Sequence, residues 1–449
     1  MEWSLQSLAA QFEALVWGPW LVALLLGGGL FFLIYSRGIP YRHLPHGLAI
    51  LLGRYDRDDD PGELSHAQAL AAALSGTLGL GNIAGVALAI AAGGPGAVFW
   101  MWMSALIGIA TKFFTCTLGV MYRGEDSLGR LQGGPMYVIR EALPKRYYPL
   151  AILFAVAGLI GTLPMFQVNQ LSALTVEVLF PEQAPVWGQP LVGLALALLV
   201  GGVIFGGLQR VAAVAVAVLP TMVVIYMAMT LWVLLNHAAE IPKMLWLIVS
   251  DAFTAKAVGG GVMGMILVGV SRGAFSNEAG VGTEVMAHGA AKTREPVREG
   301  LVAMLGPVVD TLIVCTCTAV VILLTGAWQN PGEVSGITMT AAAFYTELGI
   351  IGPVALGFVT LSLSTTTMFT TWYYGAKCFG FLFGAHIQHW FRWFFVANVI
   401  FGASVSVDVV FSLISGSYGL MAIPTMLSTL LLAPRVMAAA RAYFDRFDP

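Results

Sequence analysis

Residues 75–85 read Ser-Gly-Thr-Leu-Gly-Leu-Gly-Asn-Ile-Ala-Gly, and this stretch decides how the rest of the chain is interpreted. It lies inside an apolar segment, residues 68–93, that is long enough to cross a bilayer as a helix. Four of its eleven residues are glycine. A membrane helix with so many glycines is either packed closely against neighbouring helices or interrupted to build a site.

The composition places the whole chain in a membrane. Of its 449 residues, 58% are hydrophobic and only 10% are charged, whereas a water-soluble chain is about one quarter charged. This excludes a soluble multidomain enzyme, a disordered chain and a nucleic-acid binder. The net charge of −2 indicates no acidic or basic partner, and the four cysteines lie in apolar runs without a CxxC motif, which excludes a disulfide framework and a zinc site.

Apolar stretches of membrane-spanning length recur about eleven times along the chain. We place them at residues 15–35, 68–93, 97–121, 148–178, 190–208, 212–236, 260–283, 299–326, 350–377, 392–415 and 417–438. Backbone groups cannot go unpaired in hydrocarbon, and the segments are too long for barrel strands, so we expect helices. The fold class is therefore an all-α integral membrane protein, in contact with lipid.

The basic residues give the orientation. Lys112 and Arg272 fall within or at the ends of spans, Lys243 and Lys256 fall in one set of loops, and the remaining 18 of the 22 Lys and Arg residues fall in the other set. Because cytoplasmic loops are rich in Lys and Arg, we expect the N-terminus outside and the C-terminus inside a bacterial inner membrane. The apolar segment from Ile241 to Phe253 is too short to cross and is expected to be an external interfacial helix.

A second glycine-rich span suggests internal symmetry. The seventh span and its lead-in contain Gly259, Gly260, Gly261, Gly264, Gly269 and Gly273. Without the first span, the two glycine-rich spans are the first and sixth of ten, which gives them opposite orientations. This is the pattern of a five-plus-five inverted repeat, whose paired broken helices expose backbone groups near the bilayer midplane. We divide the single transport domain, 1–449, into an extra N-terminal helix (1–36), a first repeat (66–236), an external segment (237–258) and a second repeat (259–440).

Other interpretations of these motifs are weaker. Close helix packing is the alternative for any single glycine, since residues 81–85 also form a small-xxx-small pair. The chain has no complete nucleotide-binding motif after a strand. It has no TVGYG-like filter for a channel and no HExxH or GxSxG for a membrane enzyme, so we expect no enzyme. None of the seven histidines lies deep within a predicted span, which disfavours an imidazole proton relay.

Five strings resemble the alanine or glycine:cation symporter family, of the sodium:alanine symporter type in the amino acid-polyamine-cation superfamily. They lie at residues 81–87, 93–102, 133–137, 276–280 and 310–316. Together they cover about Gln68 to Leu431, nearly the whole chain. The resemblance implies the five-plus-five fold of the leucine-transporter type and the transport of small amino acids with sodium.

The resemblance also implies roles for individual residues. The expected substrate-binding set is Gly76, Gly79, Leu80, Gly81, Gln167, Gly260, Gly261 and Thr371. The expected sodium-binding set is Ser75, Leu78, Leu363, Thr366 and Thr367, in which neutral carbonyl and hydroxyl oxygens hold Na⁺ as the coupling ion. For Gln167 a simple interhelical hydrogen bond is an equal alternative.

Some residues depart from the family pattern. Leu80 stands where threonine is usual, and Thr371 stands where a tryptophan is expected, with Trp372 turned by about 100° around the helix. Inside the membrane, Arg272 and Glu278 could gate or anchor their helix, and Asp310 could bind an ion or be a satisfied structural carboxylate.

We therefore expect a sodium-coupled secondary symporter that imports a small neutral amino acid resembling alanine or glycine by alternating access. The alternatives are a proton-coupled amino-acid transporter and a channel-like pathway on the same fold.

Overall fold

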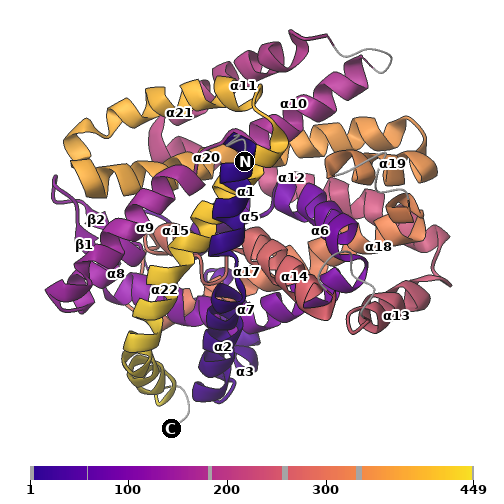
Figure 1. The fold of residues 1–449 in the computed structure, drawn as a ribbon. Coiled ribbons are helices and arrows are strands. Elements are labelled where there is room, and N and C mark those ends of the chain that lie inside the picture. The colour runs from indigo at the N-terminus through magenta and orange to yellow at the C-terminus, as the bar shows by residue number, and fades with distance from the viewer. Residues whose placement is uncertain (1–4, 58, 181–184, 255–260, 330–335, 447–449) are drawn as a thin grey trace.

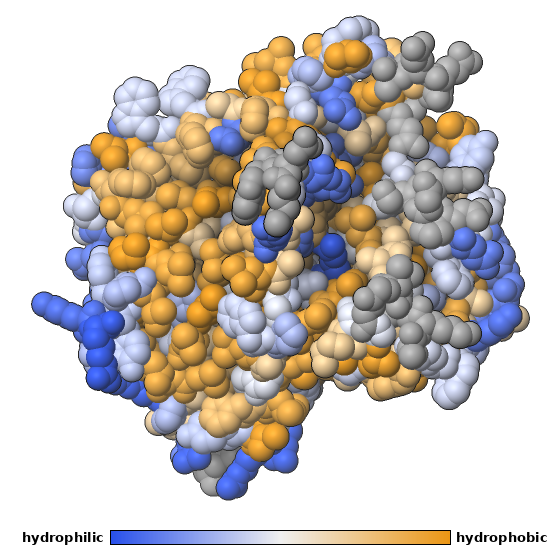
Figure 2. All heavy atoms as spheres, viewed as in Figure 1, coloured by the Kyte–Doolittle hydropathy of each residue, from blue (hydrophilic) through white to orange (hydrophobic). Residues whose placement is uncertain are grey.

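The computed structural model describes residues 5–57, 59–180, 185–254, 261–329 and 336–446, and these parts are almost entirely helical (Figure 1). The described residues contain one small sheet, in which β1 (Gly124–Glu125) pairs antiparallel with β2 (Leu131–Gln132). Hydrophobic residues cover most of the face shown in Figure 2, and hydrophilic residues gather toward its margins. An apolar belt with polar edges is the surface expected of a protein whose solvent is lipid.

Seven helical stretches of the described chain are long and apolar enough to cross a membrane, or eight if one bent pair counts as a span. The seven are Leu5–Tyr35, Gly96–Met121, Lys145–Val176, Gln209–Asn236, Pro296–Leu324, Ile351–Phe383 and Val407–Phe444. The predicted number of eleven is therefore not confirmed. Three of the predicted spans correspond to shorter helices, which are α11 (Gly188–Ile204), α14 (Gly261–Asn277) and α21 (His389–Gly402).

The N-terminal span consists of α1 (Leu5–Val16) and α2 (Pro19–Tyr35), with Pro19 at the first position of the second helix. The chain continues through α3 (Ile39–Arg42) and α4 (Leu44–Leu51). α1 packs along α22 (Val407–Phe444), the long C-terminal helix. A Cβ built at Gly416 would lie 2.5 Å from Phe12, so this glycine lets the two helices meet. Because α22 is continuous from Val407 to Phe444, the predicted boundary between the spans 392–415 and 417–438 is wrong, and the turn lies instead between α21 and α22.

The predicted interruption of the second span is confirmed. α5 (His66–Thr77) begins with a capping box at Ser65 and ends before Gly79. A π-helical segment, η1 (Gly81–Gly85), then leads into α6 (Val86–Gly93), and the two halves are bent by 50°. α7 (Gly96–Met121) follows directly, and most of its residues are buried.

The predicted position of the second interruption is wrong. α14 is a continuous helix from Gly261 to Asn277, and the described chain breaks after Asn277. Glycines inside α14 serve packing, because a Cβ at Gly269 would lie 2.5 Å from the Ala97 carbonyl oxygen of α7. The break lies instead between α14 and α15 (Glu284–His288). It is made by left-handed backbone at Glu278 (φ 56°), Gly280 and Gly282.

The remaining elements complete the bundle. In the first half these are α8 (Pro135–Ala142), η2 (Lys145–Tyr147), α9 (Tyr148–Gly161), α10 (Met165–Leu179), α12 (Gly207–Asn236) and α13 (Ile241–Asp251). The second half contains α16 (Pro296–Ala303), α17 (Leu305–Pro307), η3 (Val308–Cys315), α18 (Thr316–Leu324), η4 (Ala327–Gln329), α19 (Ile337–Leu348), α20 (Ile351–Phe383) and η5 (Ala385–Ile387). The predicted short helix at Ile241 is confirmed as α13; its external position stays a prediction.

Candidate functional site

The first helix break is held by the side chain of Asn82. The Gly79 amide, which the break removes from the helical ladder, donates to Asn82 Oδ1 at 3.1 Å. Asn82 Nδ2 in turn donates to Asp310 Oδ1 at 2.7 Å and to the Asp310 carbonyl at 3.1 Å. Asn82 is buried. One carboxamide therefore satisfies an exposed backbone donor and ties the break to η3, a second π-helical segment.

Asp310 joins three elements at this point. Its Oδ2 atom accepts hydrogen bonds from Ser276 Oγ at 3.0 Å and from Thr311 Oγ1 at 2.7 Å. Asn277 Nδ2 donates to Thr311 Oγ1 at 3.2 Å. Asp310 is fully buried, and both of its oxygens have donors. These contacts favour the structural carboxylate among the two interpretations that the sequence leaves open.

The second break is built around Glu278. Its carboxylate accepts hydrogen bonds from Tyr418 Oη at 3.1 Å and from the Thr283 hydroxyl. Glu278 is buried and has a positive φ, which is uncommon for a residue with a side chain. The described structure does not pair Glu278 with Arg272. The Arg272 guanidinium lies instead 3.9 Å from the centre of the Phe411 ring, a cation–π contact.

One face of α20 packs against the first break. The hydroxyls of Thr366 and Thr367 each donate to the Leu363 carbonyl at 2.9 Å. A Cβ added to Gly79 would lie 2.6 Å from Thr367 Oγ1. The unwound backbone and these buried hydroxyls are thus in direct contact, and only a glycine permits this approach.

Thr370 belongs to the same interface but was not predicted. Its Oγ1 lies 2.5 Å from Ser75 Oγ, and its methyl group would lie 3.3 Å from a Cβ at Gly76. The available signal was its spacing, because Thr370 follows Thr367 by three residues and therefore shares its helix face.

The residues predicted to bind sodium lie at this interface. Leu78 and Leu363 border the same cavity, which has a volume of about 10 Å³. Asn82 and Tyr226 also line it. Ser75, Thr366 and Thr367 do not line this cavity. The structure thus brings the end of α5, with Ser75 and Leu78, together with the α20 segment from Leu363 to Thr367.

The residues predicted to bind substrate are only partly brought together. Gly76, Gly79, Leu80 and Gly81 lie in or beside the first break. A Cβ at Gly81 would lie 3.4 Å from Ser276 Cα, so the break also contacts the end of α14.

Two further members of the predicted set lie on other helices. Gln167 lies on α10, and its buried Oε1 atom has no hydrogen-bond partner among the described residues. This leaves Gln167 Oε1 available to a ligand. Thr371 is buried on α20 and donates to the Met368 carbonyl at 3.2 Å.

Gly261 does not join this group. Gly261 begins α14, and a Cβ added there would meet no atom within 4 Å. Because a helix rises about 1.5 Å per residue, Gly261 is about 22 Å along α14 from Ser276, which contacts the break. Gly260 lies outside the described residues. The prediction assumed a break at the glycine cluster, whereas the break lies at the other end of α14.

A buried cluster of His66, His288 and Glu299 was also missed. His66 Nδ1 contacts Glu299 Oε2, and His288 Nδ1 lies 2.5 Å from Glu299 Oε1. All three side chains are buried. They connect the start of α5, the end of α15 and α16, so one carboxylate links the half-helices that adjoin the two breaks. No sequence signal pointed to it, because each residue stands near the end of a separate element.

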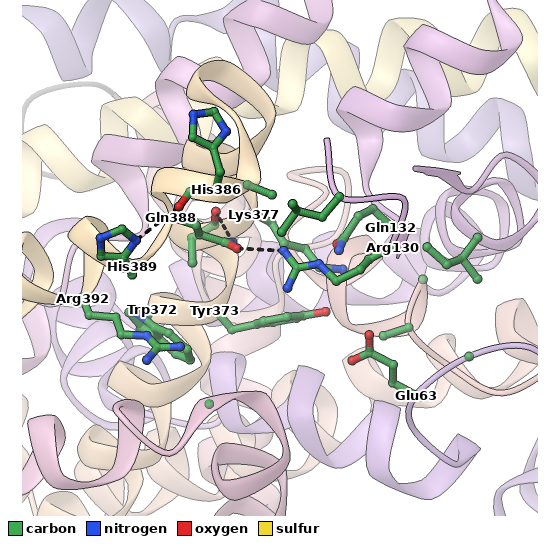
Figure 3. A pocket seen from close by; sticks show the side chains of 18 residues that line it. Glu63, Arg130, Gln132, Trp372, Tyr373, Lys377, His386, Gln388, His389 and Arg392 are labelled. Carbon is green, nitrogen blue, oxygen red and sulfur yellow. Dashed lines mark hydrogen bonds between the residues drawn. The ribbon is translucent and has the colours of Figure 1, made fainter. Parts of the chain in front are cut away.

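A wider cavity opens where α5 begins and α15 ends (Figure 3). We call it the vestibule; its volume is about 410 Å³, and its lining includes Glu63, Gln132, Trp372, Tyr373 and Arg392. Trp372 lies five residues beyond Thr367 on α20, a rise of about 7.5 Å. The vestibule therefore approaches the threonine face from the side of the Arg-rich loops.

Comparison with known proteins shows the family. The sequence pattern of the sodium:alanine symporter family matches residues 1–448. The chain belongs to this family. The sodium/alanine symporter AgcS of Methanococcus maripaludis is 36% identical, with 97% of each chain covered. The probable sodium/glutamine symporter GlnT of Bacillus subtilis is 34% identical, with 96% of this chain and 88% of GlnT covered.

A solved structure supports the fold of this family member. The crystal structure of MhsT in complex with L-phenylalanine superposes with a TM-score of 0.58 at 16% identity, covering 84% of this chain and 98% of MhsT. The fold is therefore of the leucine-transporter type. The family and the fold together make the chain a multi-pass secondary amino-acid transporter and not an enzyme.

Proposed function

We propose that this protein is a sodium-coupled symporter that imports a small neutral amino acid by alternating access in a bacterial plasma membrane. The observation that carries the proposal is the contact between the first helix break and the threonine face of α20. Neutral oxygens from two elements meet there. Such oxygens suit a monovalent cation that must be released again on the other side.

In this proposal the sodium ion is held between the two elements. Carbonyl oxygens of Ser75 and Leu78 face it from the break, and Leu363, Thr366 and Thr367 face it from α20. Support comes from the close approach of Gly79 to Thr367 and from the two hydroxyls that converge on the Leu363 carbonyl. Sodium binding then joins the break to α20, so the ion and the substrate stabilise the same conformation.

The amino acid binds beside the ion. Its carboxylate meets the backbone amides of Leu80 and Gly81, next to the Gly79 amide that Asn82 holds, where the broken helix exposes its positive dipole end. The unpartnered Oε1 of Gln167 is available to the substrate ammonium group. The substrate class is supported by two relatives, because AgcS is named a sodium/alanine symporter and GlnT a probable sodium/glutamine symporter.

The inverted repeat is part of the proposal. We assign residues 66–236 and 259–440 to the two repeats, each carrying one helix break near its start. Residues 1–36 precede them, and residues 237–258 form the connection. The distribution of Lys and Arg supports an outer N-terminus and an inner C-terminus.

Proton coupling is the second candidate, because two buried carboxylates, Asp310 and Glu278, adjoin the two breaks. The test is uptake of radiolabelled alanine, glycine and glutamine into proteoliposomes under a sodium gradient, a proton gradient or neither. We expect the sodium gradient alone to drive accumulation of at least one of them. Uptake driven by the proton gradient alone would replace the first proposal with the second.

A further inference from the structure

The vestibule carries opposite charges on its two sides. Arg392 and Trp372 lie at one side, Glu63 and Gln132 lie at the other, and the Tyr373 ring lies between them (Figure 3). The residues come from separate elements, since Trp372 lies on α20, Arg392 on α21 and Gln132 on β2. The polarity therefore results from the fold and not from one charged segment.

Two buried polar atoms of the vestibule lining have no partner. Trp372 is 5% exposed, and its Nε1 donor has no hydrogen-bond partner among the described residues. Gln132 Oε1, an acceptor at the opposite side, is also buried without a partner in this part of the chain. Unsatisfied buried groups are rare and costly, and a ligand that supplies both partners would remove the cost.

The charged side chains of the vestibule lining also differ between its two sides. Arg130 pairs with Asp126 at 2.9 Å, whereas Lys377, whose Nζ donates to the Met286 carbonyl at 2.9 Å, has no ion-pair partner among the described residues. Arg392, with its guanidinium 5.6 Å from the Trp372 ring centre, has no ion-pair partner among the described residues. Glu63 at the other side has none there either.

We propose that the vestibule is a second binding site for the transported amino acid, which occupies it as a zwitterion on its way from the central site. The carboxylate binds Trp372 Nε1 and Arg392, and the ammonium group binds Gln132 Oε1 and Glu63. A site with the Arg392 guanidinium and an indole donor at one side, and a carboxylate and an amide acceptor at the other, fits a molecule with both charges. Its volume, about 410 Å³, admits a small amino acid with water. The inference rests on the proposed function for the identity of the ligand.

The test is equilibrium binding of radiolabelled L-alanine to the purified full chain, with sodium replaced by N-methyl-D-glucamine. Without sodium the central site is unloaded, so saturable binding reports the vestibule. We expect Trp372→Phe and Arg392→Gln each to weaken this binding roughly tenfold or more, the effect of one lost hydrogen bond to a charged group. Glu63→Gln should weaken it as well.

Matched controls separate the vestibule from general effects. Trp390→Phe removes the indole of an exposed tryptophan, and Arg146→Gln removes a cation whose guanidinium lies 5.0 Å from the Tyr147 ring centre outside the vestibule. Both should leave alanine binding unchanged. Thr367→Val should reduce sodium-driven uptake but not sodium-free binding, so failure of the transport proposal is distinguishable from failure of this one.

L-lactate is the decisive competitor, because it keeps the carboxylate and methyl group of alanine and lacks the ammonium group. We expect it to compete much more weakly than unlabelled alanine. Equal competition by lactate would show a site for anions only and overturn the proposal. Absence of saturable sodium-free binding, or binding that Trp372→Phe and Arg392→Gln leave unchanged, would also overturn it.

Discussion

Thr367 Oγ1 occupies the place beside Gly79 where a side chain would stand, 2.6 Å from an added Cβ. The same hydroxyl donates to the Leu363 carbonyl at 2.9 Å. A hydroxyl of α20 thus packs directly against the glycine backbone of the unwound break. The transport proposal depends on this contact between the first break and α20.

Replacing Gly79 by alanine should inactivate transport. The added methyl group overlaps Thr367 Oγ1, and rotating Thr367 away breaks its bond to Leu363, so we expect a cost of about 1–3 kcal/mol and displacement of the break. Amino-acid uptake in proteoliposomes measures the effect. The control is Gly202→Ala on α11, where an added Cβ meets no atom within 4 Å. Normal uptake by Gly79→Ala would show that the close approach is not required.

Replacing Asn82 by alanine should destabilise the folded protein. The change leaves the Gly79 amide and one oxygen of Asp310 without their buried partner, which costs about 1–3 kcal/mol for each such group. Thermal unfolding of the purified protein tests this. Asn398→Ala is the control, because its side chain donates to the Phe394 carbonyl at an exposed position. Equal unfolding temperatures for the two variants would contradict the assigned role of Asn82.

Replacing Glu299 by glutamine should be far more costly than the same change at Glu295. Glu299 is buried between His66 and His288, and breaking a buried charged cluster costs about 3–5 kcal/mol. Glu295 pairs with the exposed Arg446 at 2.8 Å, and such surface pairs contribute about 1 kcal/mol or less. Comparison of the two unfolding temperatures checks the prediction, and a similar loss in both variants would refute it.

His237 should make a small, pH-dependent contribution to stability. Its Nε2 lies 2.9 Å from Glu347 Oε1. The hydrogen bond to Glu347, and to a smaller extent the one to Glu240, raises the pKa of His237 above its usual value. A raised folded-state pKa gives stability that is fully present below the unfolded-state value, about 6.5, and is lost as pH rises through the folded-state value. His237→Gln should therefore lower the unfolding temperature at pH 6 more than at pH 9. A difference independent of pH would contradict this prediction.

The first helix break could be predicted from sequence because its glycines make it. Gly79 has no side chain where α20 approaches, and the density of glycine around it indicates an interruption. The second glycine cluster was misleading because Gly269 and Gly273 pack α14 against α7. The true break places the non-glycine residue Glu278 in left-handed backbone, which residue preferences do not anticipate.

The polar connections of the site were beyond sequence reasoning. Asn82 and Asp310 are 228 residues apart, and only the fold shows that they are bonded. No histidine lies deep within a predicted span, yet His66 and His288 are both buried, with Glu299 between them. Sequence periodicity places residues on a helix face, but it does not say which faces of distant helices meet.

The most direct test of the central claim is the sodium dependence of amino-acid uptake by Thr367→Val and Thr367→Ser in proteoliposomes. Valine keeps the shape of threonine without its hydroxyl, and serine keeps the hydroxyl. We predict that Thr367→Val raises the sodium concentration needed for half-maximal uptake at least tenfold while Thr367→Ser stays near the wild type. An unchanged sodium dependence in Thr367→Val, with the protein folded, would contradict the proposed ion site between the first break and α20.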